Sequence, residues 1–244
     1  SAVATQAGRE VKRSVLELGG SDPFIVLSDA DLDAAVEAAV TARFQNSGQV
    51  CIAAKRIILE EPIREEFTRK FVEQVETLPV GDPLDPSTRV GPIAREDLLD
   101  QLANQVERSI AAGATLVTGG AKVPGDGFFY VPTVLADVVP GTPAFTEELF
   151  GPVAVLIAAT DAEHAVELAN DSEFGLGSSV WTVDLDRAED VAARIEAGSV
   201  FVNKVGVSDP RVPIGGIKKS GFGRELSHYA LQEFTNVQTV WCER

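Results

Sequence analysis

The sequence predicts an α/β domain with a mostly parallel sheet flanked by helices. Short apolar runs typical of strands alternate with runs whose apolar residues recur at helical spacing, from one end of the chain to the other. Parallel strands need a crossover connection between them, usually a helix, so this alternation indicates βαβ units. At 244 residues, 45% of them hydrophobic, the chain is long enough to bury a substantial core.

In the first half of the chain, apolar runs predict strands and amphipathic runs predict helices. Phe24–Leu27 is a short apolar strand, and Ser28–Asp31 supplies side-chain oxygens that can cap a helix running to about Phe44. The further elements expected here are a strand at 56–59, a helix at 63–78, a Pro-rich loop at 79–92, a helix at 95–112 and a strand at 115–117.

The second half repeats this alternation and ends in an uncovered strand. The elements expected are a strand at 153–158, a helix at 162–169, a strand at 178–182, a helix at 186–196 and a strand at 199–203. Asn236–Trp241 then reads as a last strand with nothing after it to cover it. Because a bare strand edge invites pairing, we expect this strand to join another domain or subunit, in a homodimer or larger homo-oligomer.

Charge and composition exclude several classes of partner. The net charge of −16, spread along the chain, disfavours binding to nucleic acid or to anionic membranes. No apolar run approaches the ~20 residues that span a bilayer, and the first residues lack the basic-then-apolar order of a signal peptide. We therefore expect a cytoplasmic protein, with Cys51 and Cys242 not joined in a disulfide.

Cys51 is the candidate nucleophile. A lone cysteine in a globular protein is usually a small buried residue, but this one follows Gly48 and Gln49 and precedes an apolar run, where we expect a helix to start. The positive end of a helix dipole favours a thiolate, and the free backbone N–H groups there can hold an oxyanion. This position therefore predicts a reactive thiol.

Glu17 is the candidate base. It lies between Leu16 and Leu18, just before a glycine pair, and a charged residue in an apolar strand is costly unless it is paired or functional. Taken alone, a structural salt bridge is as good an interpretation as a catalytic base. Together with Cys51, however, such a carboxylate is suited to covalent catalysis followed by base-assisted hydrolysis.

The other candidate motifs indicate no site. His164 and His228 have no partners at metal-ligand or catalytic-triad spacing, so we expect no metal centre. The run Gly215–Gly221 contains Gly, Lys and Ser but lacks the spacing of a phosphate-binding loop.

Two segments resemble the active-site signatures of the aldehyde dehydrogenase superfamily. These are Leu16–Gly20 (LELGG) and Gly48–Cys51 (GQVC), in the order and separation that the family has. Four further segments agree: Glu147–Val153, Asn170–Leu176, Gly198–Asn203 and Pro213–Gly221. Within the superfamily, the chain is most similar to the bacterial NAD(P)-dependent succinate-semialdehyde dehydrogenases in three longer stretches, QNSGQVCIAAKR, ANDSEFGLGSSVWT and KKSGFGRELSHYALQEFTNVQTVW.

The resemblance implies a role for each matching residue. The Cys51 thiolate would attack an aldehyde to give a thiohemiacetal, oxidation with NAD or NADP would give a thioester, and Glu17 would activate the water that hydrolyses it to the acid. Glu148 would contact the nicotinamide ribose and Phe150 would lie beside the cofactor. The backbone at Leu18 and Gly19 would flank the nicotinamide.

The resemblance makes succinate semialdehyde the first expectation for the substrate. Family positions for the substrate correspond to Gln45, Val50, Ile52, Ser208 and Ile214. Several residues depart from the pattern. Gln45 stands where better-known enzymes place a carboxylate-binding arginine, with Arg43 two residues earlier, while Ile214 replaces a frequent phenylalanine and Ser21 a frequent lysine. A broad-specificity or acylating aldehyde dehydrogenase therefore stays open, as does a non-catalytic relative on the same scaffold, although retention of Cys51 and Glu17 disfavours the latter.

The length is the main departure from the family pattern. Family chains are roughly twice as long, and the absent half carries most of the dinucleotide-binding domain, an oxyanion-holding asparagine and the lysine that binds the adenine ribose. We therefore interpret residues 1–19 as a remnant of the dinucleotide-binding domain, 20–234 as the catalytic domain and the segment that follows it, and 235–244 as an oligomerisation strand. A chain of this extent is expected to be inactive alone.

Overall fold

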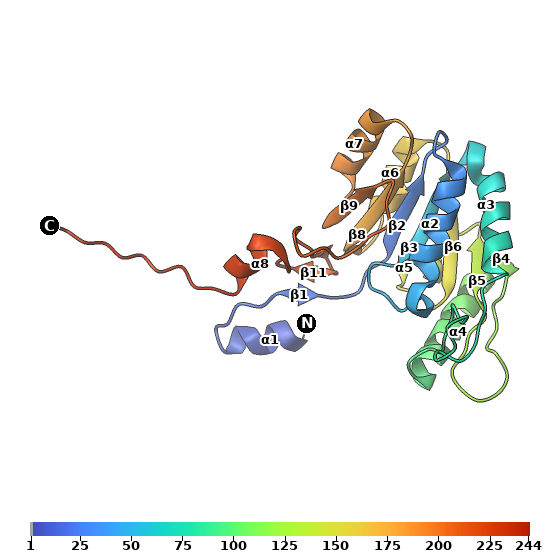
Figure 1. The fold of residues 1–244 in the computed structure, drawn as a ribbon, viewed down its shortest axis with the longest axis horizontal. Coiled ribbons are helices and arrows are strands. Elements are labelled where there is room, and N and C mark those ends of the chain that lie inside the picture. The colour runs from blue at the N-terminus through green and yellow to red at the C-terminus, as the bar shows by residue number, and fades with distance from the viewer. Residues whose placement is uncertain (1) are drawn as a thin grey trace.

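The computed structural model describes residues 2–244, and its body is a seven-stranded sheet (Figure 1). Within those residues the strand order is β4-β5-β6-β3-β2-β8-β9, and only β4 runs antiparallel to its neighbour. The strands are β2 (Asp22–Val26), β3 (Ala54–Glu60), β4 (Thr115–Thr118), β5 (Thr133–Ala136), β6 (Val153–Ala159), β8 (Gly177–Trp181) and β9 (Ser199–Val202). The prediction of an α/β fold with a mostly parallel sheet is confirmed.

Helices cover both faces of this sheet. They are α2 (Leu32–Phe44), α3 (Glu61–Val75), α4 (Glu96–Ala111), α5 (Pro143–Thr146), α6 (Ala162–Asn170) and α7 (Leu185–Arg194). Alternate side chains of β2 point to opposite faces, so that Phe24 and Val26 pack with α2 and α3 while Ile25 packs in the core that α4 to α7 cover. The two faces thus form two separate apolar cores, and the strands between them read as continuous hydrophobic runs.

The elements expected in the body form with ends shifted by a few residues at most. Asp31 caps α2 as predicted, because its carboxylate accepts a hydrogen bond from the N–H of Ala34 at 3.1 Å. Asp161 caps α6 in the same way through the N–H of His164. The sequence analysis missed α5 and β5, which are only four residues long, too short for a periodicity to appear.

A smaller lobe lies beside the body, at its left in Figure 1. It contains α1 (Ala2–Arg9), β1 (Leu16–Glu17) paired with β11 (Gly221–Phe222), and α8 (Ser227–Glu233). A second short ladder joins β7 (Phe174–Gly175) to β10 (Ile217–Lys218). Sequence analysis predicted none of these pairings, because each strand is only two residues long and its partner is distant in the sequence.

The C-terminal segment runs away from the body without regular structure (Figure 1). The strand expected at Asn236–Trp241 does not form within residues 2–244. A strand exists only through hydrogen bonds to a neighbour, and this chain brings no neighbour to the segment. Val237 is 97% exposed and Trp241 is 84% exposed. Its pairing with a second chain stays a prediction, as do the domain boundaries after residues 19 and 234.

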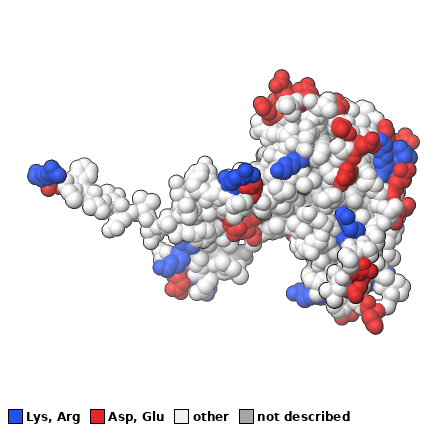
Figure 2. All heavy atoms as spheres, viewed as in Figure 1, with Lys and Arg blue, Asp and Glu red and all other residues white. Residues whose placement is uncertain are grey.

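The surface carries both signs of charge. Figure 2 shows acidic side chains distributed over the visible face of the body, with basic ones between them. Among residues 2–244, no helix combines the length and apolarity that crossing a membrane requires. In the same residues, no group of three or more His, Cys, Asp or Glu side chains is arranged to hold a metal ion.

Candidate active site

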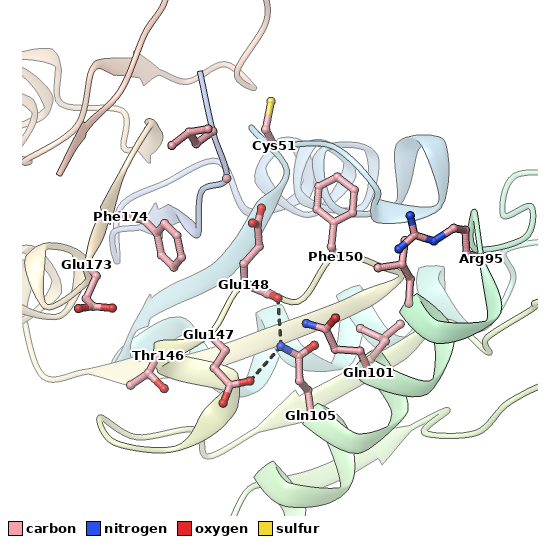
Figure 3. A pocket seen from close by; sticks show the side chains of 14 residues that line it. Cys51, Arg95, Gln101, Gln105, Thr146, Glu147, Glu148, Phe150, Glu173 and Phe174 are labelled. Atoms are coloured by element: carbon pink, nitrogen blue, oxygen red, sulfur yellow. Dashed lines mark hydrogen bonds between the residues drawn. The ribbon is translucent and has the colours of Figure 1, made fainter. Parts of the chain in front are cut away.

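The segments that precede four parallel strands converge on one cavity of about 740 Å³. The strands β6, β3, β2 and β8 are neighbours in the sheet and run parallel, so their amino ends lie along one edge. The residues just before each of them, together with one side of α4, form the walls (Figure 3). The lining residues include Leu18, Gly19, Cys51, Glu148, Phe150 and Phe174.

Cys51 lies in a tight turn and not at the start of a helix, so that prediction was wrong. The single-turn 3₁₀ helix η1 (Gln45–Gly48) comes before it, the N–H of Ala53 donates to the carbonyl of Val50 at 3.2 Å, and the chain enters β3 at once. The β-branched pair Ile57 and Ile58 fits a strand here, and it is buried on both faces of the sheet. The helix-dipole argument for the thiol therefore does not apply.

The thiol is nevertheless exposed on the cavity wall (Figure 3). Within the described residues, the backbone N–H groups of Cys51 and Ile52 have no hydrogen-bond acceptor. Free N–H groups beside a nucleophile are what a developing oxyanion needs. The turn thus supplies by another route the donors that the helix start was expected to give.

Glu148 is held at one carboxylate oxygen and free at the other. Its Oε1 accepts from the Lys55 ammonium at 3.0 Å and from the N–H of Gly20 at 3.1 Å. In the part of the chain that the structure describes, Oε2 has no hydrogen-bond partner, and the side chain lines the cavity. A Cβ at Gly19 would collide with Oε2, so a larger residue there would displace this carboxylate.

Glu17 lies in β1, and its carboxylate accepts a hydrogen bond from the N–H of Gly216 at 3.1 Å. Burial raises the pKa of Glu17, and the nearby Glu225 carboxylate adds to the rise, while the Gly216 N–H and Arg224 oppose it. Its side chain does not line the cavity with Cys51, although Leu18 and Gly19, which follow it, do. The structure therefore joins Cys51, Leu18, Gly19, Glu148 and Phe150 in one site and leaves Glu17 beside it.

The comparison with known families identifies the family of the chain. The family model described as "Aldehyde dehydrogenase family" matches residues 1–240. The chain belongs to the aldehyde dehydrogenase family. The resemblance inferred from the motifs is confirmed.

Relatives within the aldehyde dehydrogenase family are similar over the whole chain. The succinate semialdehyde dehydrogenase [NAD(P)+] Sad of Escherichia coli K12 is 58% identical over all 244 residues, which correspond to 53% of that protein. The succinate-semialdehyde dehydrogenase [NADP(+)] of Mycobacterium avium is 53% identical over 98% of this chain and 51% of its own length. The chain spans about half the length of the curated relatives it matches.

A solved aldehyde dehydrogenase structure has the same fold. The succinic semialdehyde dehydrogenase from Streptococcus pyogenes, in complex with NADP+ as the cofactor, superposes with a TM-score of 0.96 at 36% identity. The match covers 100% of this chain and 53% of that one.

Sequence analysis of this aldehyde dehydrogenase chain missed a group of buried charges beneath Cys51. The Lys55 side chain is 2% exposed and donates to the carbonyls of Val50 and Cys51 at 2.9 and 2.8 Å. Asp22 is buried next to it and accepts from the N–H of Gly177 at 3.0 Å. Burial raises the pKa of Asp22 to about 6, against the opposing effect of the Lys55 ammonium.

Arg43 is a structural residue and not a substrate ligand. It is 0% exposed, and its guanidinium donates to the carbonyls of Leu149 at 2.9 Å, Val153 at 2.6 Å and Gly151. These carbonyls belong to the loop that carries Glu148 and to the strand that follows it. Arg43 therefore fixes that loop to α2, and it is unavailable to bind a substrate carboxylate.

The residues expected at the substrate positions do not line the cavity with Cys51. Ile52 lies against the 203–209 loop, since a Cβ at Gly206 would be 3.8 Å from Ile52 Cδ1. Ser208 belongs to the same loop. Ile214 exchanges backbone hydrogen bonds with Glu225, and Gln45 begins η1. The assignment of Gln45, Val50, Ile52, Ser208 and Ile214 to a substrate site stays a prediction.

Proposed function

We propose that the protein carrying this chain oxidises an aldehyde to its carboxylic acid with NAD(P)+, through a covalent intermediate on Cys51. The proposal is carried by three side chains that line one cavity. They are the exposed thiol of Cys51, the carboxylate of Glu148 with one oxygen free of hydrogen bonds, and the exposed ring of Phe150. Family membership supports the reaction class, and the names of the succinate-semialdehyde dehydrogenases that resemble it support that substrate.

Cys51 is the nucleophile in this proposal. As thiolate it attacks the aldehyde carbon, the carbonyl oxygen becomes an oxyanion, and the free N–H groups of Cys51 and Ile52 are the nearest donors for that charge. The product is a thiohemiacetal. Loss of a hydride from its carbon gives a thioester that water can hydrolyse.

The residues on the cavity wall fit a nicotinamide dinucleotide. Glu148 presents a free carboxylate oxygen, which can accept a hydrogen bond from a ribose hydroxyl. The Phe150 ring is 39% exposed and offers a face to a flat heterocycle. The oxidised nicotinamide ring is cationic, so both the face of the Phe150 ring and the nearby carboxylates attract it. When bound, NAD(P)+ supplies the acceptor for the hydride.

Glu17 is our candidate for the base that activates the hydrolytic water. Its raised pKa makes it a better proton acceptor than an ordinary carboxylate. Its hydrogen bond to Gly216 holds the carboxylate in one orientation. Its position next to Leu18 and Gly19 keeps it within one residue of the cavity wall.

Succinate semialdehyde is the proposed substrate, with its carboxylate bound by hydrogen-bond donors such as Gln45 and Ser208. We also propose a homodimer or larger assembly in the cytoplasm. We propose that the 244 residues alone lack dehydrogenase activity, because they correspond to only about half the length of the relatives that they match.

A labelling and turnover experiment tests the function. In the whole protein, Cys51→Ala should abolish both aldehyde-dependent NAD(P)H formation and the label that iodoacetamide places on this residue near neutral pH. Cys242→Ser is the matched control, since that thiol is also exposed and lies in the C-terminal segment. Full turnover in Cys51→Ala, or equal labelling of the two cysteines in the folded protein, would contradict the nucleophile assignment.

A further inference from the structure

The Lys55 ammonium lies beneath the turn that carries Cys51. It has three N–H donors, and all three have acceptors: the carbonyl of Val50 at 2.9 Å, the carbonyl of Cys51 at 2.8 Å and Oε1 of Glu148 at 3.0 Å. The side chain is 2% exposed, so these acceptors replace water completely. A lysine that served only as an ion-pair partner would need the carboxylate alone.

The two carbonyl contacts determine where two N–H groups point. The peptide bonds of the described chain are trans, and in a trans peptide the C=O and the N–H point in opposite directions. The carbonyl of Val50 shares its peptide with the N–H of Cys51, and the carbonyl of Cys51 shares its peptide with the N–H of Ile52. Both carbonyls accept from the buried ammonium, so both N–H groups point away from it.

We propose that Lys55 is a positioning residue that directs the backbone N–H groups of Cys51 and Ile52 at the developing oxyanion. The proposal rests on the proposed function, since it requires Cys51 to form tetrahedral intermediates. The same ammonium fixes Oε1 of Glu148 and leaves Oε2 facing the cavity. One buried cation thus sets the relative positions of the nucleophile turn and of the carboxylate that faces the cofactor.

Two reactions of the same thiol separate this role from a merely structural one. Alkylation by iodoacetamide is a displacement at a saturated carbon and forms no oxyanion. Acylation by p-nitrophenyl acetate proceeds through an oxyanion: the thiolate adds to the ester carbonyl, the C–O bond to p-nitrophenolate breaks, and a thioester remains. Neither reaction needs NAD(P)+. The ratio of the acylation rate to the alkylation rate therefore reports oxyanion stabilisation, with thiolate content and accessibility cancelled.

The variants are made in the whole protein, and only the signal that disappears in Cys51→Ala is counted. Lys55→Met keeps the length of the side chain but removes its donors, and we expect the acylation-to-alkylation ratio to fall ~10-fold or more, short of the 10²–10³ lost when an oxyanion donor is deleted outright. Lys70→Met is the matched control, because Lys70 also pairs with carboxylates but lies on α3, away from the cavity. Its ratio should not change.

A second pair of variants covers the case in which Lys55→Met does not fold. Lys55→Met combined with Glu148→Gln removes both charges of the ion pair, and its ratio should again be lower than that of Glu148→Gln alone. A ratio unchanged in every folded Lys55 variant would overturn the proposal. Loss of neither reaction in Cys51→Ala would instead overturn the proposed function, so the two failures are distinguishable.

Discussion

We expect the Asp22 carboxyl group to make the folded state less stable as pH rises, and Asp22→Asn to remove that dependence. The carboxyl group is buried at the start of β2, where it accepts a hydrogen bond from the N–H of Gly177. Burial raises its pKa from the ordinary value of 3.8 to about 6. The amide side chain of the variant would keep a carbonyl oxygen for the Gly177 N–H but cannot ionise.

The sign and size follow from proton linkage. A group with a raised pKa in the folded state stabilises that state below its unfolded pKa, and this stability is lost as pH rises through the folded pKa. A rise from 3.8 to about 6 corresponds to ~3 kcal/mol at ~1.4 kcal/mol per pH unit. Part of the loss has already occurred at pH 4, so about 2 kcal/mol remains between pH 4 and pH 7.

Urea unfolding of wild type and Asp22→Asn across this pH range measures the effect. The free energy of unfolding of the variant, minus that of wild type, should increase by about 2 kcal/mol from pH 4 to pH 7. Other ionisable groups cancel in the difference. A difference that stays constant would mean that the ammonium of Lys55 balances burial, and one that decreases with pH that it outweighs burial; either result would refute the reasoning.

Three further predictions concern the site and the assembly. Glu17→Gln in the whole protein should retain a burst of NAD(P)H but lower steady-state turnover ~10²-fold or more, and turnover within about threefold of wild type would exclude Glu17 as the base. Gly19→Ala should raise the KM for NAD(P)+ ~10-fold or more by displacing Glu148. Gly8→Ala, which meets nothing within 4 Å, should leave it unchanged, and equal values for the two variants would contradict the steric argument. Deletion of residues 236–244 should reduce the number of chains in the assembly, as given by the molar mass from light scattering. An intact protein that is already monomeric would contradict the proposed assembly.

The fold was predictable because its signals are local. The strands and helices of the body follow from apolar spacing and from caps such as Asp31, which a short window of sequence contains. The turn at Cys51 was not predictable in this way, because Ile52–Ala54 is compatible with a helix until the parallel pairing of β3 with β2 fixes it as a strand entry. The pairing of β1 with β11 depends on residues distant in sequence for the same reason.

The buried charges show most clearly where the local signals end. Lys55 and Arg56 stand side by side in the sequence and read as ordinary polar residues, yet both are about 1% exposed. Their acceptors include Glu148 for Lys55 and the carbonyls of Leu168 and Ala169 for Arg56, about a hundred residues away. Nothing within the β3 segment indicates those contacts. Glu148 and Phe150 could be assigned only through the family resemblance.

The hydrogen bonds of Arg43 join the two walls of the cavity that carry Cys51 and Glu148. The guanidinium ties α2 to the loop that carries Glu148 and Phe150, and α2 leads directly into η1 and Cys51. If α2 detaches, the thiol and the carboxylate therefore lose their positions together. Heat inactivation should accordingly remove thiol acylation and cofactor binding in the same transition, with no intermediate temperature at which one survives without the other.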